Sequence, residues 1–179
     1  MGSSKALLPV GGKPLIVHVV SFLRALFADV VVVAAPDQEL PPLSCVVVRD
    51  EVAYQGPLSG LRNGLAAAGH DITFATSCDS PFLSASLIEH LVACLGNYDA
   101  VVPRWQDRDQ PLHAVYHRRI LPIVDEQLAR GQRRLLDVLP RLQTCRLSED
   151  AIRRFDRTGH SFVNINTPAD YARALKERG

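Results

Sequence analysis

The strongest constraint on the fold is the alternation of two kinds of segment along the chain. Short, largely apolar runs rich in valine occur at residues 30–35, 45–48, 72–76 and 100–102. Continuous apolarity is typical of strands that are covered on both faces. Longer stretches with helical spacing lie at residues 14–27, 58–68, 84–95 and 118–130. Strands that alternate with helices predict βαβ units, and therefore an α/β fold with a mostly parallel sheet.

Size and charge predict a single soluble domain that spans residues 1–179. The chain is 47% hydrophobic, and its 20 lysines and arginines nearly balance 19 acidic residues. A net charge of +1 argues against bulk electrostatic binding to nucleic acid or to an anionic membrane. No apolar run approaches the roughly 18 residues that span a bilayer, and the N-terminus lacks a secretion signal. Four widely spaced cysteines without a CxxC pair exclude a zinc knuckle and argue against a disulfide framework, so we expect a reduced, cytoplasmic protein.

Ligands of parallel α/β sheets bind beyond the carboxyl ends of the strands, so the residues that follow each run are the candidates for a site. Asp79 follows the run at 72–76 within the motif SCDSPF. A carboxylate at this place can hold Mg²⁺ against a phosphate, because Mg²⁺ takes one or two carboxylates and completes its shell with phosphate and water oxygens. The alternative is that Asp79 only caps the helix expected near Ser84.

Glycines and lysines at two further places are candidates for phosphate binding. Gly56 and Gly60 flank the start of the helix expected at 58–68, where bare N–H groups come close to a ligand or where the chain only turns tightly. Lys5 and Lys13 lie in a stretch rich in glycine and serine. They either neutralise phosphates or belong to a solvated chain start.

The C-terminal part adds amide and basic side chains. Residues 162–168 alternate apolar and polar residues, which predicts a short strand with Asn164 and Asn166 on one face. The two asparagines either order a loop or contact a ligand. Thr167, Pro168 and Asp170 predict the start of a last helix. The pairs Arg133 and Arg134, and Arg104 and Arg108, together suit the grip of an acidic substrate.

The histidines and cysteines do not predict a catalytic set. His113 and His117 lie four residues apart on an expected strand, which separates them by about 13 Å, too far to share a metal. Cys78 stands beside Asp79, and a neighbouring carboxylate raises a thiol pKa, so we interpret Cys78 as a small buried residue.

Taken in order, six motifs resemble the molybdenum cofactor guanylyltransferases, a family of Rossmann-like nucleotidyltransferases. They are MGSSKALLPVGGKPL, RDEVAYQGPLSGL, TSCDSPFL, RDQPLHAVYHR, GQRRLL and FVNINTPADY. The resemblance covers nearly the whole chain. It implies a three-layer sheet with helices on both faces, and Mg²⁺-dependent transfer of GMP from GTP to molybdopterin, or to its molybdenum-loaded form, with release of pyrophosphate.

The resemblance also implies roles for individual residues. Lys5 matches the lysine that neutralises the triphosphate, Asp79 matches the magnesium aspartate, and Asp50 matches a nucleotide-contacting aspartate. The GPL turn, formed by Gly56, Pro57 and Leu58, would wall the guanine pocket, and Gly60 follows it. The pterin would contact the basic pair Arg133 and Arg134 and the asparagines Asn164 and Asn166. Association with other cofactor-assembly proteins or with molybdoenzymes is a further implication.

Two departures from the family pattern keep alternatives open. The family signature opens with a strand and a glycine-rich loop upstream of the methionine with which this chain begins, so we expect the sheet to lack that first strand and loop. Either the natural protein extends upstream, or the chain is poorly active, which leaves a non-catalytic pterin-binding protein as an alternative. An asparagine that helps define the base pocket is also absent after residues 30–33. A CTP-dependent molybdopterin cytidylyltransferase, or another small-molecule phosphate nucleotidyltransferase, is therefore a second alternative.

Overall fold

The computed structural model describes residues 5–51 and 56–177. The helices are α1 (Leu15–Leu26), α2 (Pro57–Ala67), α3 (Ala85–Ala93), α4 (Leu121–Ala129), α5 (Leu135–Val138), α6 (Glu149–Ile152) and α7 (Pro168–Glu177). Short 3₁₀ turns are η1 (Lys5–Leu7), η2 (Arg118–Ile120), η3 (Leu139–Arg141) and η4 (His160–Phe162). The strands are β1 (Pro9–Val10), β2 (Lys13–Pro14), β3 (Val31–Ala34), β4 (Val46–Arg49), β5 (Ile72–Thr76), β6 (Ala100–Trp105), β7 (Arg108–Asp109), β8 (His113–His117) and β9 (Thr144–Leu147).

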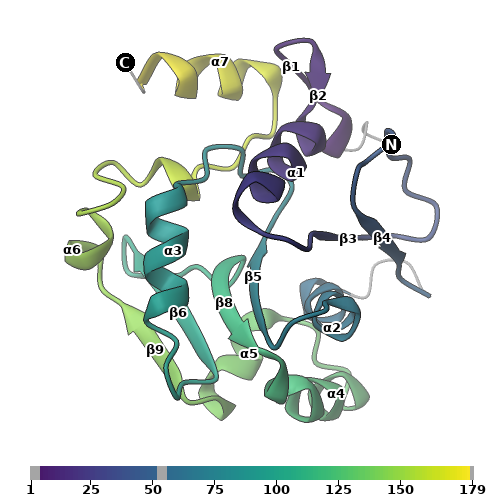
Figure 1. Ribbon diagram of the computed structural model, residues 1–179, viewed down its shortest axis with the longest axis vertical. Helices are drawn as coiled ribbons and strands as arrows, with labels where there is room; N and C mark the ends of the chain where they lie inside the picture. Colours follow the sequence, from purple (N-terminus) through teal and green to yellow (C-terminus); the bar gives the residue numbers. More distant parts are fainter. Residues whose placement is uncertain (1–4, 52–55, 178–179) are drawn as a thin grey trace.

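The main sheet has the strand order β5-β8-β6, and both β7 and β9 pair with β6 (Figure 1). β8 is antiparallel to β5 and to β6, whereas β9 is parallel to β6. Consequently β5, β6 and β9 run in one direction, and β8 is the reversed strand between them. β3 and β4 form a separate parallel pair. The prediction of a mostly parallel sheet is confirmed, with β8 and the two-residue β7 as antiparallel exceptions.

Helices cover both faces of the sheet, which gives three layers. Ala100, Val102 and Tyr116 pack toward α2 and α4 on one face. Their neighbours Val101 and Val115 pack toward α3 and α6 on the other face. This division follows from the alternation of side chains along a strand. Within the described part of the chain, no helix is both long and apolar enough to cross a membrane.

Local sequence signals account for the ends of several helices. The hydroxyl of Ser84 accepts a hydrogen bond from the backbone N–H of Leu87 (3.3 Å) and so caps α3. The hydroxyl of Thr167 accepts from the N–H of Asp170 (3.1 Å), and the carboxylate of Asp170 accepts from the N–H of Thr167 (2.9 Å). This reciprocal pair is a capping box. It confirms the start of the last helix that the sequence predicts.

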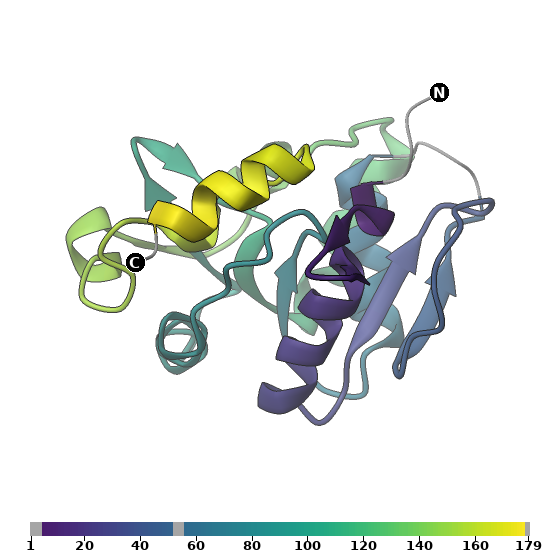
Figure 2. The same ribbon diagram turned by 90° about the horizontal axis from the view of Figure 1, so that it is seen from above.

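Among the described residues, no strand pairing joins the β3–β4 pair to the main sheet. A cavity of about 800 Å³ lies between β3 and β5, with α1 and α2 along its sides. Its walls are mainly apolar and include Val32 and Val33 of β3, Phe74 of β5 and Val20 of α1. β3 and β5 belong to different sheets (Figure 2).

One predicted element is wrong. Residues 162–168 do not form a strand, because η4 ends at Phe162 and residues 163–166 are irregular. The backbone N–H of Ile165 donates to the carbonyl of Asp79 (2.7 Å), and the N–H of Asn166 donates to the side chain of Asp170 (3.1 Å). The apolar and polar residues alternate because Ile165 is buried between the exposed Asn164 and Asn166. The backbone hydrogen bonds of this segment go to a loop and to the cap of α7, not to a partner strand.

Candidate active site

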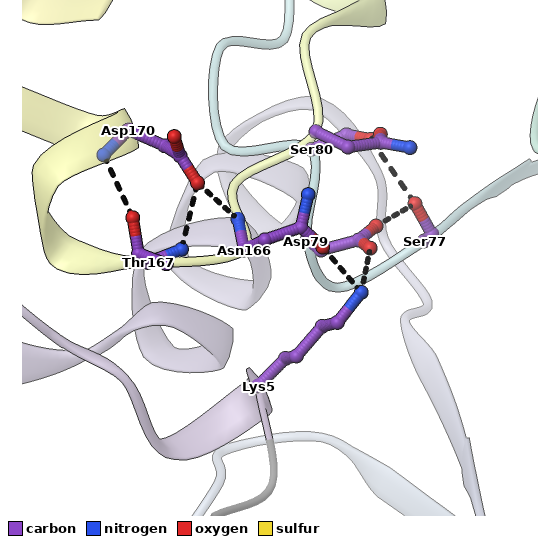
Figure 3. Close-up of polar contacts among 8 residues, drawn as sticks. Lys5, Ser77, Asp79, Ser80, Asn166, Thr167 and Asp170 are labelled. Carbon is purple, nitrogen blue, oxygen red and sulfur yellow. Dashed lines mark hydrogen bonds and ion pairs between the residues drawn. The ribbon is translucent and has the colours of Figure 1, made fainter. Parts of the chain in front are cut away.

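Three residues far apart in the sequence meet at the carboxyl end of β5 (Figure 3). The Nζ atom of Lys5 lies 3.6 Å from Oδ2 of Asp79 and donates a hydrogen bond to Oδ1 of Asn166 (2.5 Å). Lys5 comes from η1, Asp79 from the turn after β5, and Asn166 from the segment before α7. The side chain of Lys5 is 52% exposed and that of Asp79 is 18% exposed, so the lysine faces solvent above a half-buried carboxylate.

Two serines complete the surroundings of Asp79. The hydroxyl of Ser77 donates to Oδ1 of Asp79 (2.6 Å) and lies 3.0 Å from the hydroxyl of Ser80. The buried Ser80 donates in turn to Oδ1 of Asn164 (2.9 Å). The carboxylate therefore has one oxygen bonded to a hydroxyl and the other turned toward Lys5.

An open pocket of about 570 Å³ lies beside η1, against the loop that follows β3. Leu7, residues 36–41 and Arg49 line it. One nitrogen of the Arg49 guanidinium donates to the carbonyls of Ala35 (2.9 Å), Pro36 (3.4 Å) and Gln38 (2.6 Å). Arg49 thus holds the loop in one shape along the pocket wall.

Asp50 and the glycine turn lie at the end of β4 and the start of α2. Oδ1 of Asp50 accepts a hydrogen bond from the amide of Asn63 on α2 (2.6 Å). Gly56 has φ +83°, and a Cβ there would lie 2.9 Å from the carbonyl oxygen of Arg133. That carbonyl also accepts from the N–H of Leu58 (3.2 Å). Only glycine fits this turn without strain, and the turn is packed against the loop of the basic pair.

The remaining predicted residues divide between surface and interior. Arg133 and Arg134 are exposed just before α5. Pro57 and Gly60 line the cavity between β3 and β5. The side chain of Leu58 is fully buried in the core against α4 and the sheet. The structure thus places Arg133 beside the glycine turn, and Asn164 and Asn166 beside Asp79 and Lys5.

The donor set at Asp79 fits Mg²⁺ better than a metal with an all-protein cage. Across residues 5–51 and 56–177, no three His, Cys, Asp or Glu side chains gather as a metal-binding group. Mg²⁺ needs only one or two carboxylates, because substrate phosphates and water supply its other oxygen ligands. The half-buried carboxylate of Asp79, whose Oδ2 faces Lys5 while Oδ1 accepts from Ser77, suits this mode of binding.

Cys78 does not compete with Asp79 for a chemical role. Burial raises the pKa of its thiol, and the adjacent carboxylate of Asp79 raises the pKa further. The thiol stays protonated at neutral pH and packs with Ile16 and Val20 of α1. This agrees with the interpretation of Cys78 as a small buried residue.

Sequence reasoning missed four residues that hold the site together: Ser77, Ser80, Arg49 and Asn63. The two serines flank Asp79 in the motif SCDSP, so their proximity to the carboxylate was a usable signal. Arg49 and Asn63 gave no comparable signal, because their partners lie 11 to 14 residues away along the chain.

Comparison with known proteins decides the family. The model of the MobA-like NTP transferase domain matches residues 1–145, most of the chain. The chain belongs to the MobA-like NTP transferase family. It is therefore a nucleotidyltransferase, as the sequence predicts.

Relatives of similar length support this membership. A probable molybdenum cofactor guanylyltransferase of Carboxydothermus hydrogenoformans is 32% identical over 98% of this chain and 89% of its own length. A molybdenum cofactor guanylyltransferase of Desulfosudis oleivorans is 31% identical over 97% of this chain and 86% of its own length.

Solved structures share the fold of this chain. The molybdopterin-guanine dinucleotide biosynthesis protein A of Archaeoglobus fulgidus has a TM-score of 0.78 at 25% identity, over 97% of this chain and 90% of its own. A 2-C-methyl-D-erythritol 4-phosphate cytidylyltransferase of Thermus thermophilus has a TM-score of 0.72 at 19% identity, over 98% of this chain and 94% of its own. At that identity the second likeness concerns the fold alone.

Proposed function

We propose that this protein transfers GMP from GTP to molybdopterin, or to its molybdenum-loaded form, in molybdenum cofactor biosynthesis. The observation that carries the proposal is the meeting of Lys5, Asp79 and Asn166 at the carboxyl end of β5 in a chain of the MobA-like family. Relatives named as molybdenum cofactor guanylyltransferases, at 31–32% identity over nearly the full length, support guanine as the base and the pterin as the acceptor.

The reaction joins two anions. An oxygen of the acceptor's terminal phosphate attacks the α-phosphorus of GTP, and a new P–O bond forms. The bond from that phosphorus to the oxygen bridging the α- and β-phosphates breaks, and pyrophosphate leaves with the electron pair. The attacking phosphate is already anionic at neutral pH, so no general base is required. Positioning and charge neutralisation are the tasks left to the protein.

Lys5 and Asp79 perform these tasks in the proposal. Lys5 neutralises the triphosphate, because its exposed ammonium group lies at the mouth of the site. Asp79 would hold the Mg²⁺ ion through its carboxylate. Bound Mg²⁺ supplies Lewis-acid charge on the phosphate oxygens. In the proposal, Asp50, whose carboxylate accepts from Asn63, contacts the nucleotide together with the turn at Gly56.

The acceptor lies on the side of the asparagines and the basic pair. Asn164 and Asn166 are exposed beside Asp79, where an acceptor phosphate has to approach the α-phosphorus. Arg133 and Arg134 are exposed cations that suit the phosphate of the pterin. The product then passes to other cofactor-assembly proteins or to a molybdoenzyme in the cytoplasm.

Replacement of the metal carboxylate tests the proposal. Asp79→Asn keeps the size of the side chain but removes the charge that binds Mg²⁺. We expect the rate of guanylyl transfer from radiolabelled GTP to molybdopterin to fall about 100-fold or more, because a metal contributes several kcal/mol to such transition states. Asp125→Asn is the matched control, since Asp125 forms an exposed ion pair with Arg62. Near-normal transfer by Asp79→Asn would exclude Asp79 as the metal ligand.

A further inference from the structure

We propose that Ser77 and Ser80 are positioning residues for the carboxylate of Asp79, and that Asn164 anchors them from the C-terminal segment. The proposal rests on the proposed function, because it concerns how Asp79 is presented to Mg²⁺. It also gives Asn164 a role that differs from contact with the acceptor.

Close polar contacts connect Asp79 to Asn164 through the two serines. Ser77 gives its single hydroxyl proton to Oδ1 of Asp79 at 2.6 Å. Ser80 gives its single proton to Oδ1 of Asn164 at 2.9 Å, which fixes the Ser80 side chain with its oxygen 3.0 Å from that of Ser77. The anchored Ser80 thereby limits the rotation of the Ser77 hydroxyl that bonds Asp79.

These contacts determine which oxygen of the Asp79 carboxylate is available to a metal ion. Ser77 occupies Oδ1, and Oδ2 points toward Nζ of Lys5 at 3.6 Å (Figure 3). The bond to Asn166 holds the same ammonium group at a fixed place beside the carboxylate. Oδ2 of Asp79 and the ammonium group of Lys5 therefore face the same space before a ligand arrives. This preorganisation lowers the entropic cost of binding.

The anchor is firm because residues 164–166 are attached at more than one point. The N–H of Ile165 donates to the carbonyl of Asp79 at 2.7 Å, and the Ile165 side chain is fully buried. Asp170 accepts from the N–H of Asn166 at 3.1 Å. The segment is thus fixed to the turn of Asp79 on one side and to the start of α7 on the other. It lies beyond residues 1–145, the range of the family model.

Affinity for Mn²⁺ in the presence of GTP, measured by electron paramagnetic resonance, tests the proposal. Mn²⁺ is a paramagnetic substitute that prefers the same oxygen ligands as Mg²⁺. We expect Ser77→Ala to weaken Mn²⁺ binding about tenfold, as removal of hydrogen-bond partners of metal ligands generally does. Ser77→Thr keeps a hydroxyl and should restore most of the affinity. Ser80→Ala and Asn164→Ala should give smaller losses of the same sign.

The control is Ser86→Ala, which removes an exposed hydroxyl on α3 and should leave Mn²⁺ affinity unchanged. Wild-type affinity in Ser77→Ala would overturn the proposal. Crystal structures of metal-free Ser77→Ala and Asn164→Ala provide a readout that does not depend on the reaction. A rotated Asp79 carboxylate in Ser77→Ala supports positioning, and an unmoved one overturns it. Failure of the wild-type protein to bind Mn²⁺ with GTP would contradict the proposed function, while these crystal structures would still decide the positioning role.

Discussion

The guanidinium of Arg49 is bonded to three backbone carbonyls, so the loop after β3 has a fixed shape before any ligand binds. Peptide carbonyls that converge on one cation are costly to leave unpaired where water is limited. Arg49 also lines the pocket beside η1. At the scale of single residues, we infer that this side chain shapes the loop beside which the nucleotide binds.

Arg49→Ala should therefore raise the KM for GTP several-fold and leave the KM for molybdopterin unchanged. The loop loses its common donor, but the groups around Asp79 stay in place. A lysine at this position has a compact ammonium group without the planar guanidinium, so Arg49→Lys should raise the KM for GTP less than Arg49→Ala does. Steady-state kinetics with each substrate varied in turn provide the measurement. Arg24→Ala on the exposed face of α1 is the control, and an equal rise in both KM values would argue against a role confined to the nucleotide.

Two glycines show how the surroundings of an element decide the effect of one methyl group. Gly159 precedes η4 with φ +73°, and a Cβ there would lie 2.2 Å from the ring of Trp105. Gly64 lies within α2, where a Cβ would meet Val33 at an ordinary 3.6 Å. Position 159 has no room for a side chain. At position 64, glycine only destabilises the helix relative to alanine.

We expect Gly159→Ala to lower the free energy of unfolding by about 3 kcal/mol, from overpacking and from left-handed backbone strain. Gly64→Ala should raise it by about 1 kcal/mol, because alanine is the better helix former. Denaturant-induced unfolding of the two variants beside the wild-type protein gives both values. A stabilised Gly159→Ala would show that the loop before η4 packs differently against Trp105.

The elements themselves were largely predictable from local sequence. Apolar runs located β3, β4, β5 and β6, and periodic spacing located α1 to α4 within a few residues. The predicted strand at 162–168 failed, because period-two alternation also arises where one apolar residue, Ile165, is buried between two polar ones. Such a pattern carries no information about whether a partner strand lies beside it.

The site was only partly predictable, because its contacts are nonlocal. Asp79 and Lys5 were predicted as partners of the same phosphates, and the structure places them 3.6 Å apart. The bond between Ser80 and Asn164 joins residues 84 positions apart, and no spacing rule reports such a pair. The burial of the Leu58 side chain in the core follows from its place on the inward face of α2, which the motif alone does not report.

At the scale of the whole molecule, the described interior contains a buried histidine, His113, whose ring makes no hydrogen bond there. His113 of β8 is packed edge-on against Phe74 and Phe162, and neither ring nitrogen has a hydrogen-bond partner among the described residues. Burial lowers the pKa of His113 to about 4, although the negative charge of Asp156 opposes the shift. The folded state therefore keeps the ring neutral at pH values where the unfolded chain binds a proton.

This linkage predicts acid destabilisation. Above the unfolded pKa of about 6.5, neither state binds the proton, and His113 makes no pH-dependent contribution. As the pH falls from 6.5 to about 4, only the unfolded state gains a proton, so the free energy of unfolding should drop by about 3 kcal/mol. His113→Leu should remove most of this decline, while exposed His70→Gln should keep it. Unfolding curves at several pH values give the comparison, and an unchanged decline in His113→Leu would assign it to other groups.

At the same scale, the three layers, the family membership and the cluster around Asp79 lead to one central claim, guanylyl transfer to a pterin phosphate. The most direct test is release of pyrophosphate by the wild-type protein, measured with GTP, CTP, ATP and UTP in the presence of molybdopterin and Mg²⁺. The account predicts release with GTP that requires both the acceptor and Mg²⁺. Release with CTP but not with GTP, or pterin binding without any nucleotide turnover, would contradict it.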